Sequence, residues 1–258
     1  MNDRNGGMDE PAVDALAGRV VIVTGASRGI GLATAHALSA RGARVAMLAR
    51  GKQELEEAAA SLAGDALPLV ADVSDPVAVT AAFAQVVAHF GALHALVNNA
   101  AVGRIARVED ARDEDLVAQV GINLLGPIYC SRAAIPHLRE AGGGDIINLS
   151  SDSVERPFPF LSVYAATKGG LETFTLGLRT EVAEDGIRVT LLRSGPSLTS
   201  FARDWQSEAA GRAFEAWQAG GYIHAGGVVT PEVIGAGVVQ ILTLPVEASV
   251  FTLDIRPR

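Results

Sequence analysis

The sequence is poor in cysteine, and this scarcity excludes two kinds of chemistry. Cys130 is the only cysteine among 258 residues, so no internal disulfide can form. The five histidines are dispersed, and no Cys or His group has the spacing of a metal site. We therefore expect no bound metal. A single thiol also agrees with a reducing, cytoplasmic environment.

Basic residues and long apolar runs are scarce as well, which narrows the range of partners. Lys and Arg number 21 against 29 Asp and Glu, so the formal net charge is -8, and the basic residues are scattered rather than gathered on one face. No run of about 18 apolar residues occurs, and the polar N-terminus has no signal-peptide pattern. The sequence thus predicts a cytoplasmic protein that binds neither nucleic acid nor membrane.

Apolar residues, in contrast, are plentiful enough for a sizeable core. They make up 49% of the chain, and charged residues only 19%. Residues 1–16 form a polar, Gly-containing tail that we expect to be disordered. Because no compositional break divides the remainder, we predict a single domain over residues 17–258.

Short apolar strands alternate with helices along this domain. Predicted strands cover residues 19–24, 43–49, 67–71, 95–98, 145–150, 187–192 and 249–255. Predicted helices cover residues 30–40, 52–62, 76–90, 113–139 and 162–184, and a last one begins near residue 231. Asp75 is the predicted cap of the helix over residues 76–90. Such alternation requires right-handed crossovers. The prediction is an α/β fold with a doubly wound, parallel, seven-stranded Rossmann sheet and helices on both faces.

Residues 197–229 interrupt this rhythm after the sixth strand. Because ligands of such sheets bind at the carboxyl ends of the strands, we expect this insertion to cover a substrate. Its aromatic residues fit helical spacing, so core packing or a subunit contact is an alternative role for them. His224 either lines the pocket or is an ordinary loop residue. The aromatic residues are Phe201, Trp205, Phe214, Trp217 and Tyr222.

A glycine-rich turn joins the first strand to the first helix, reading Thr24-Gly25-Ala26-Ser27-Arg28-Gly29-Ile30-Gly31. Its glycines permit a tight turn and a close approach of the backbone to a pyrophosphate, and the helix N-terminus faces that anion. An ordinary strand–turn–helix corner is the alternative. We predict a dinucleotide site here, with cofactor contacts from Gly25, Ser27, Arg28, Gly29, Ile30 and Gly31.

The end of the second strand favours NADP over NAD. An NAD-binding enzyme usually has a carboxylate there for the ribose hydroxyls, whereas this chain has Arg50. Arg50 and Arg28 offer guanidinium groups suited to a 2′-phosphate, although each could be a solvated surface charge. Further cofactor contacts are predicted at the ends of strands three and four, from Asp72, Val73, Asn99 and Ala100.

Tyr164 and Lys168 are the candidate acid–base pair of the sequence. They are four residues apart on a predicted helix and therefore share a face. A phenol ionises near pH 10, and a neighbouring cation lowers that pKa. A buried Tyr with an exposed Lys is the ordinary alternative. Ser151 follows the fifth strand, and its hydroxyl can meet the same carbonyl oxygen as the phenol.

In order and spacing, these motifs resemble those of short-chain dehydrogenases/reductases, in particular an NADP-preferring subgroup. The resemblance covers about residues 18–257 and includes the glycine turn, Asn98-Asn99-Ala100, Asn123, Ser151, Tyr164 and Lys168. It implies that Tyr164 donates a proton to the substrate carbonyl oxygen, which Ser151 orients and polarises.

The resemblance assigns supporting roles to two further residues. Lys168 would bind the nicotinamide ribose and lower the pKa of Tyr164. Asn123 would hold a water that relays protons to Lys168, although a polar helix residue facing a neighbour is the alternative.

The chain departs from the family pattern in places. Ser194-Gly195 stands where many members have Pro-Gly, and Arg193 before it is unusual. Gly195 and Thr199 remain cofactor contacts, Thr199 at the nicotinamide carboxamide. A Gly-Gly tail at the C-terminus is absent, so we expect a homodimer or homotetramer through helices 113–139 and 162–184.

The sequence therefore predicts an NADP(H)-dependent oxidoreductase acting on a ketone or aldehyde, or reversibly on a secondary alcohol. Pro157-Phe158-Pro159-Phe160 hints at an apolar, bulky carbonyl compound. Two alternatives stay open, an NAD-linked alcohol dehydrogenase and a non-catalytic NADPH-binding sensor or structural protein. The Asn, Ser, Tyr and Lys set favours the enzyme, because binding alone does not require a phenol beside an ammonium.

Overall fold

The computed structural model describes residues 16–197, 199, 201, 205, 207–222 and 227–258. Its centre is one seven-stranded sheet with the order β3-β2-β1-β4-β5-β6-β7, in which every neighbouring pair is parallel. The strands are β1 (Val20–Thr24), β2 (Arg44–Ala49), β3 (Ala66–Val70), β4 (Ala95–Asn98), β5 (Gly144–Ser151), β6 (Ile187–Ser194) and β7 (Thr252–Ile255). The predicted doubly wound fold is confirmed, and its strand order reverses between β1 and β4, where such sheets bind ligands.

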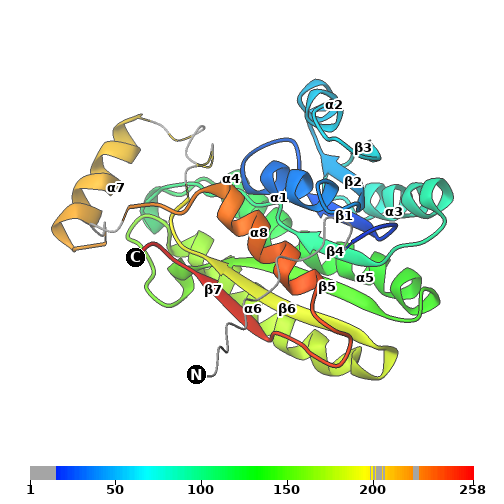
Figure 1. Ribbon diagram of the computed structural model, residues 1–258. Helices are drawn as coiled ribbons and strands as arrows, with labels where there is room; N and C mark the ends of the chain where they lie inside the picture. The colour runs from blue at the N-terminus through cyan, green and yellow to red at the C-terminus, as the bar shows by residue number, and fades with distance from the viewer. Residues whose placement is uncertain (1–15, 198, 200, 202–204, 206, 223–226) are drawn as a thin grey trace, which may run out of the picture.

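Helices cover both faces of the sheet (Figure 1). On one face, α1 (Gly29–Ser39), α2 (Lys52–Ala60) and α8 (Pro231–Leu242) share a buried cluster with β1 and β2. On the other, α3 (Pro76–Phe90), α5 (Gly126–Glu140) and α6 (Ser162–Glu181) enclose a second cluster. Two-sided burial explains why the strands are apolar runs; all five residues of β1 are buried.

A side-chain cap marks the beginning of α3. Asp75, the predicted cap of α3, accepts hydrogen bonds from the backbone N–H groups of Val77 and Ala78. At the start of the described residues, Leu16 is fully buried and its N–H donates to the Arg41 carbonyl. The last residue of the predicted tail therefore packs into the core beside α1. The rest of that tail lies outside the described residues.

The helix predicted over residues 113–139 is divided. It consists of α4 (Asp113–Val120), a π-helical turn (Gly121–Leu125) and α5. Pro127 supplies the reason, because it has no N–H to donate to the carbonyl of Asn123 four residues earlier. The backbone widens here, as π-turns do at many functional sites.

The 197–229 insertion contains a helix that the strand–helix alternation does not predict. α7 (Ser207–Ala219) lies outside the two helix layers, on the side of the molecule where the C-terminus lies (Figure 1). Its inner side chains, Ala213 and Trp217, form a third buried cluster with Ile105 and Leu161. The insertion thus packs against loops at the carboxyl ends of the strands.

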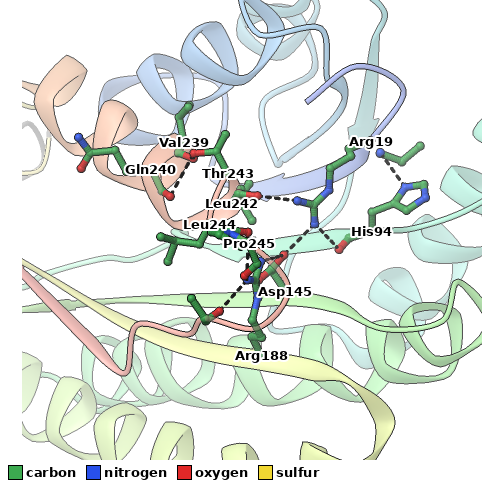
Figure 2. Close-up of polar contacts among 12 residues, drawn as sticks. Arg19, His94, Asp145, Arg188, Val239, Gln240, Leu242, Thr243, Leu244 and Pro245 are labelled. Atoms are coloured by element: carbon green, nitrogen blue, oxygen red, sulfur yellow. Dashed lines mark hydrogen bonds and ion pairs between the residues drawn. The ribbon is translucent and has the colours of Figure 1, made fainter. Parts of the chain in front are cut away.

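A charged cluster closes the opposite, amino-terminal edge of the sheet (Figure 2). Asp145, 2% exposed, accepts from Arg19 Nη2 at 2.7 Å and from Arg188 Nε at 2.7 Å. Arg19 also donates to the Leu242 carbonyl at 2.7 Å, and Arg188 to the Pro245 carbonyl at 2.9 Å. One carboxylate therefore joins β1, β5 and β6 to the end of α8.

His94, at the same edge, makes the stability of the fold depend on pH. Its Nδ1 accepts the backbone N–H of Val20 at 2.9 Å (Figure 2). Burial and the positive charges of Arg19 and Arg44 hold the pKa of His94 below 6.5. Below about pH 6.5 the unfolded chain binds a proton that the folded chain resists. We therefore expect the free energy of unfolding to decrease as the pH falls below about 6.5.

Denaturant unfolding at about pH 7.5 and about pH 5.5 measures this effect. His94→Asn, which keeps an acceptor near the Nδ1 position but does not titrate, is the matched control. The decrease between the two pH values should be smaller in the variant. An equal decrease in both proteins would assign the pH dependence to other groups.

Candidate active site

A cavity of about 770 Å³ opens at the carboxyl ends of the strands. It brings together nearly all residues that the sequence predicts as site residues, namely Gly25, Ser27, Arg28, Gly29, Ile30, Arg50, Asp72, Val73, Asn99, Ala100, Ser151, Tyr164, Lys168, Gly195 and Thr199. Gly31 and Asn123 are not among the residues that line the cavity. The size lies within the range of about 300–1,000 Å³ that is typical of ligand sites.

The glycine turn forms one end of this cavity. Gly25 and Gly29 have φ values of 65° and 55°, which favour glycine. A Cβ at Gly31 would lie 2.3 Å from the Gly25 carbonyl oxygen, so Gly31 serves the tight packing of the turn. Asn99 braces the turn by donating from Nδ2 to the Thr24 carbonyl at 2.8 Å. The result is a rigid backbone cradle of the kind that a pyrophosphate needs.

Two arginines stand beside this cradle, each with a carboxylate close by. Arg28 lies 3.8 Å from Glu54, and Arg50 lies 3.7 Å from Asp72. Partial burial opposes ionisation of Asp72, yet hydrogen bonds from Ser74 and the charge of Arg50 hold its pKa below the usual value. Both guanidinium groups line the cavity and are partly exposed. The donor set fits a phosphorylated ribose.

Sequence reasoning missed Glu54. Its carboxylate accepts a hydrogen bond from Ser27 Oγ at 3.2 Å and lines the same cavity. Glu54 lies in α2, four residues after Arg50, so the position of α2 directly after the strand is the signal that could have indicated it. A carboxylate here competes with any anionic ligand for Ser27 and Arg28.

Ser151, Tyr164 and Lys168 meet where β5 ends beside α6. The Ser151 hydroxyl is hydrogen-bonded to Tyr164, and Lys168 Nζ lies 6.0 Å from the centre of the Tyr164 ring. Lys168 is buried and donates to the Leu149 carbonyl at 2.7 Å. The strand–helix junction thus places all three polar groups in one cavity, as the spacing predicts.

Burial sets the acid–base character of this group. It raises the pKa of Tyr164 to about 12, although the hydrogen bond with Ser151 acts in the opposite direction. It also lowers the pKa of Lys168 to about 8, and the negative charge of Glu172 opposes that fall. The structure does not show the expected lowering of the phenol pKa by Lys168, because desolvation, together with the charge of Asp152, raises that pKa. A phenol with this pKa is a proton donor at neutral pH.

Glu172 belongs to a charge network that the sequence does not predict. It accepts from Ser150 Oγ at 2.6 Å and from Arg193 at 2.8 and 2.6 Å. Arg193, the unusual residue before Ser194-Gly195, also lies 3.0 Å from Glu155, which pairs with Arg256 at 2.7 Å. Glu172 is one helical turn after Lys168, a spacing that could have indicated it.

Asn123 lies in the π-helical turn. Its side chain accepts from the Val102 N–H and donates to the Val102 carbonyl, both at 2.8 Å, and it donates to Thr167 Oγ1 at 3.1 Å. The side chain thus ties the loop after β4 to α6. Pro127 has no N–H to donate to the Asn123 carbonyl, so this oxygen lacks the usual α-helical donor.

The far wall of the cavity is aromatic. Rings from the 197–229 insertion and from the loop after β5 line it, namely Phe158, Phe201, Trp205, Phe214 and Trp217. Tyr222 packs against Phe158 at 5.3 Å without lining the cavity. His224 lies outside the described residues. Described residues of the insertion therefore line the cavity, and a covering role over a substrate stays a prediction.

Three further features of the described residues are their potential metal ligands, the lone thiol and the apolar character of the helices. There, no group of three or more His, Cys, Asp or Glu side chains is placed to hold a metal ion. Cys130 is fully buried, and burial raises the pKa of its thiol to about 12. Across the same residues, none of the helices combines the length and apolar character that a bilayer crossing requires.

Comparison with known proteins agrees with this site. The family model for short chain dehydrogenases matches residues 19–210. A 3-oxoacyl-[acyl-carrier-protein] reductase of Homo sapiens is 35% identical over 190 residues, which are 74% of this chain and 80% of that protein. An oxidoreductase of Staphylococcus haemolyticus is 32% identical over 243 residues, covering 94% and 98% of the two chains.

Solved structures of oxidoreductases also resemble this chain in fold. An alcohol dehydrogenase from the archaeon Thermococcus sibiricus, complexed with 5-hydroxy-NADP, superposes with a TM-score of 0.80 at 27% identity over 93% of this chain and 96% of that one. A 3-ketoacyl-(acyl-carrier-protein) reductase from Brucella melitensis, complexed with NADH, gives 0.83 at 29% identity over 93% and 98%. Because the family model matches residues 19–210 and a relative with 32% identity covers 94% of the chain, this protein belongs to the short-chain dehydrogenases/reductases.

Proposed function

We propose that this protein is an NADPH-dependent carbonyl reductase that also oxidises secondary alcohols in the reverse direction. The observation that carries the proposal is the meeting of Ser151, Tyr164 and Lys168 in the cavity that also holds the glycine turn. Positioned acid–base groups beside a dinucleotide cradle suit hydride transfer to a carbonyl. A sensor that only binds NADPH would not require this arrangement.

The residues divide the work of the reaction as follows. Bound NADPH would supply the hydride. Tyr164, protonated at neutral pH, gives its hydroxyl proton to the carbonyl oxygen, which Ser151 orients by a hydrogen bond. Lys168 holds a ribose hydroxyl and stabilises the phenolate that remains. Lys168 then returns a proton to the phenolate, and a water held by Asn123 relays a proton from the solvent back to Lys168.

The test is the loss of NADPH absorbance with a panel of ketones and aldehydes. We expect turnover of at least one carbonyl compound. If NADPH binds tightly but no compound is reduced and no secondary alcohol is oxidised, the sensor becomes the better assignment.

Preference for NADPH over NADH rests on Arg28 and Arg50. Replacing both by Gln is expected to weaken NADPH binding at least about tenfold and to change NADH binding much less, because only NADPH has the 2′-phosphate. Titration of each nucleotide by fluorescence measures both affinities.

Arg44→Gln is the matched control for that pair, since Arg44 lies at the opposite end of β2 and also pairs with a carboxylate, Asp65. Its nucleotide affinities should equal those of the native protein. Tighter binding of NADH than NADPH by the native protein would contradict the preference and favour an NAD-linked alcohol dehydrogenase.

We also propose that the protein forms a homodimer or homotetramer through the α4–α5 and α6 surfaces. Large apolar side chains are exposed there, namely Val117, Val120, Leu125 and Leu176. Such side chains on neighbouring helices suit a two-fold contact that buries them.

A further inference from the structure

The aromatic wall of the cavity is a continuous series of rings that begins at Tyr164. The Tyr164 and Phe201 rings are 5.1 Å apart, Phe201 and Trp205 5.7 Å, and Trp205 and Trp217 5.9 Å. Phe158 continues the series at 5.4 Å from Trp217. All four pairs meet edge to face. A substrate whose carbonyl reaches Tyr164 therefore lies along aromatic surface.

Both indole N–H groups in this wall are already used by the protein. Trp205 Nε1 donates to the Gly103 carbonyl at 3.0 Å, and Trp217 Nε1 donates to the Pro159 carbonyl at 2.7 Å. These bonds fix the orientation of each ring and leave it no donor for a ligand. The wall can therefore recognise a ligand by ring contacts and exclusion of water, but not by indole hydrogen bonds.

A carboxylate, Asp152, lies where the aromatic wall meets Ser151 and Tyr164. Asp152 accepts from Ser151 Oγ at 3.2 Å, and its negative charge is felt at Tyr164, whose pKa it raises. Arg104, a cation in the cavity lining, lies 3.2 Å from the carboxylate of Asp115, which balances its charge. A carboxylate attached next to the substrate carbonyl would thus lie close to the negative charge of Asp152.

We infer that this site selects neutral ketones that carry an aryl group and rejects those with a carboxylate beside the carbonyl. The inference rests on the proposed reductase activity and names its substrate class. A flat ring can enter the edge-to-face series, whereas a saturated ring or a linear chain of the same size gains fewer ring contacts.

Two matched pairs of compounds test the inference with the NADPH-loaded native protein. Methyl phenylglyoxylate and phenylglyoxylate differ mainly in charge, and we expect kcat/KM to be at least about tenfold higher for the ester. Phenyl methyl ketone has a planar aromatic ring and cyclohexyl methyl ketone a saturated one. We expect kcat/KM to be about fivefold higher for the phenyl compound. Equal values within either pair would overturn the corresponding half of the inference.

Variants assign the preferences to residues. Trp217→Leu should lower the kcat/KM ratio of phenyl methyl ketone to propanone about tenfold, and Trp217→Phe should lower it less. Phe251→Leu, which changes an exposed ring outside the cavity, should leave that ratio as in the native protein. Asp152→Asn should reduce the difference in kcat/KM between methyl phenylglyoxylate and phenylglyoxylate. An unchanged ratio in Trp217→Leu, or an unchanged gap in Asp152→Asn, would contradict the assignment.

Failure of this inference is distinguishable from failure of the proposed function. If the protein reduces cyclohexyl methyl ketone and phenylglyoxylate as well as their partners, it is a reductase with another substrate class. If it reduces none of the compounds while binding NADPH, the reductase itself is rejected.

Discussion

Replacing Tyr164 by phenylalanine is expected to reduce kcat for carbonyl reduction by about a hundredfold to ten-thousandfold. The substitution removes only the hydroxyl, while the ring keeps its contact with Phe201 at 5.1 Å and its place near Lys168. NADPH affinity and thermal stability should therefore change little. Initial rates on the best ketone of the panel, with nucleotide titration alongside, measure both effects.

Tyr129→Phe is the matched control, because Tyr129 lies on α5 and outside the cavity lining. Its rate should remain close to that of the native protein. Full activity in Tyr164→Phe would remove this phenol from the mechanism. The proton donor would then have to be sought elsewhere in the cavity.

Loss of the Asp145 carboxylate should have the largest effect on stability. In Asp145→Ala, Arg19 and Arg188 would remain largely buried, with 26% and 17% of their side chains exposed, and would lose their common partner. Breaking a buried ion pair in this way typically costs about 3–5 kcal/mol of the free energy of unfolding. Denaturant unfolding at neutral pH measures the loss.

Asp185→Ala provides the comparison, because Asp185 also pairs closely with an arginine, Arg139, but at the surface. Exposed pairs contribute little to stability, so this loss should be much smaller. Equal losses in the two variants would mean that burial does not govern the strength of the Asp145 cluster.

The sequence predicts the framework of this molecule because local patterns determine it. Buried β-branched runs such as β1 and the cap at Asp75 lie within short stretches of chain, and the structure confirms both. The glycine turn, Ser151, Tyr164 and Lys168 follow from strand ends and helical spacing. They meet in one cavity because parallel strands end at the same edge of the sheet.

Features that depend on contacts between distant segments escaped prediction. Glu172 and Arg193 meet across α6 and β6, and neither residue signals the other along the chain. α7 packs its inner face against Ile105 and Leu161 rather than against the sheet, so the strand–helix rhythm does not indicate it. Pro127 could have indicated the π-helical turn at Asn123, because it interrupts the hydrogen-bond ladder near the middle of the predicted helix.

The buried lone thiol makes local unfolding of this protein measurable by chemical labelling. Cys130 is fully enclosed between α5 and the sheet, and its raised pKa keeps it protonated. A thiol-modifying reagent can then react only in molecules in which α5 has separated from the strands. Pulsed labelling of the native chain would therefore count open molecules directly, with no engineered probe and no competing site.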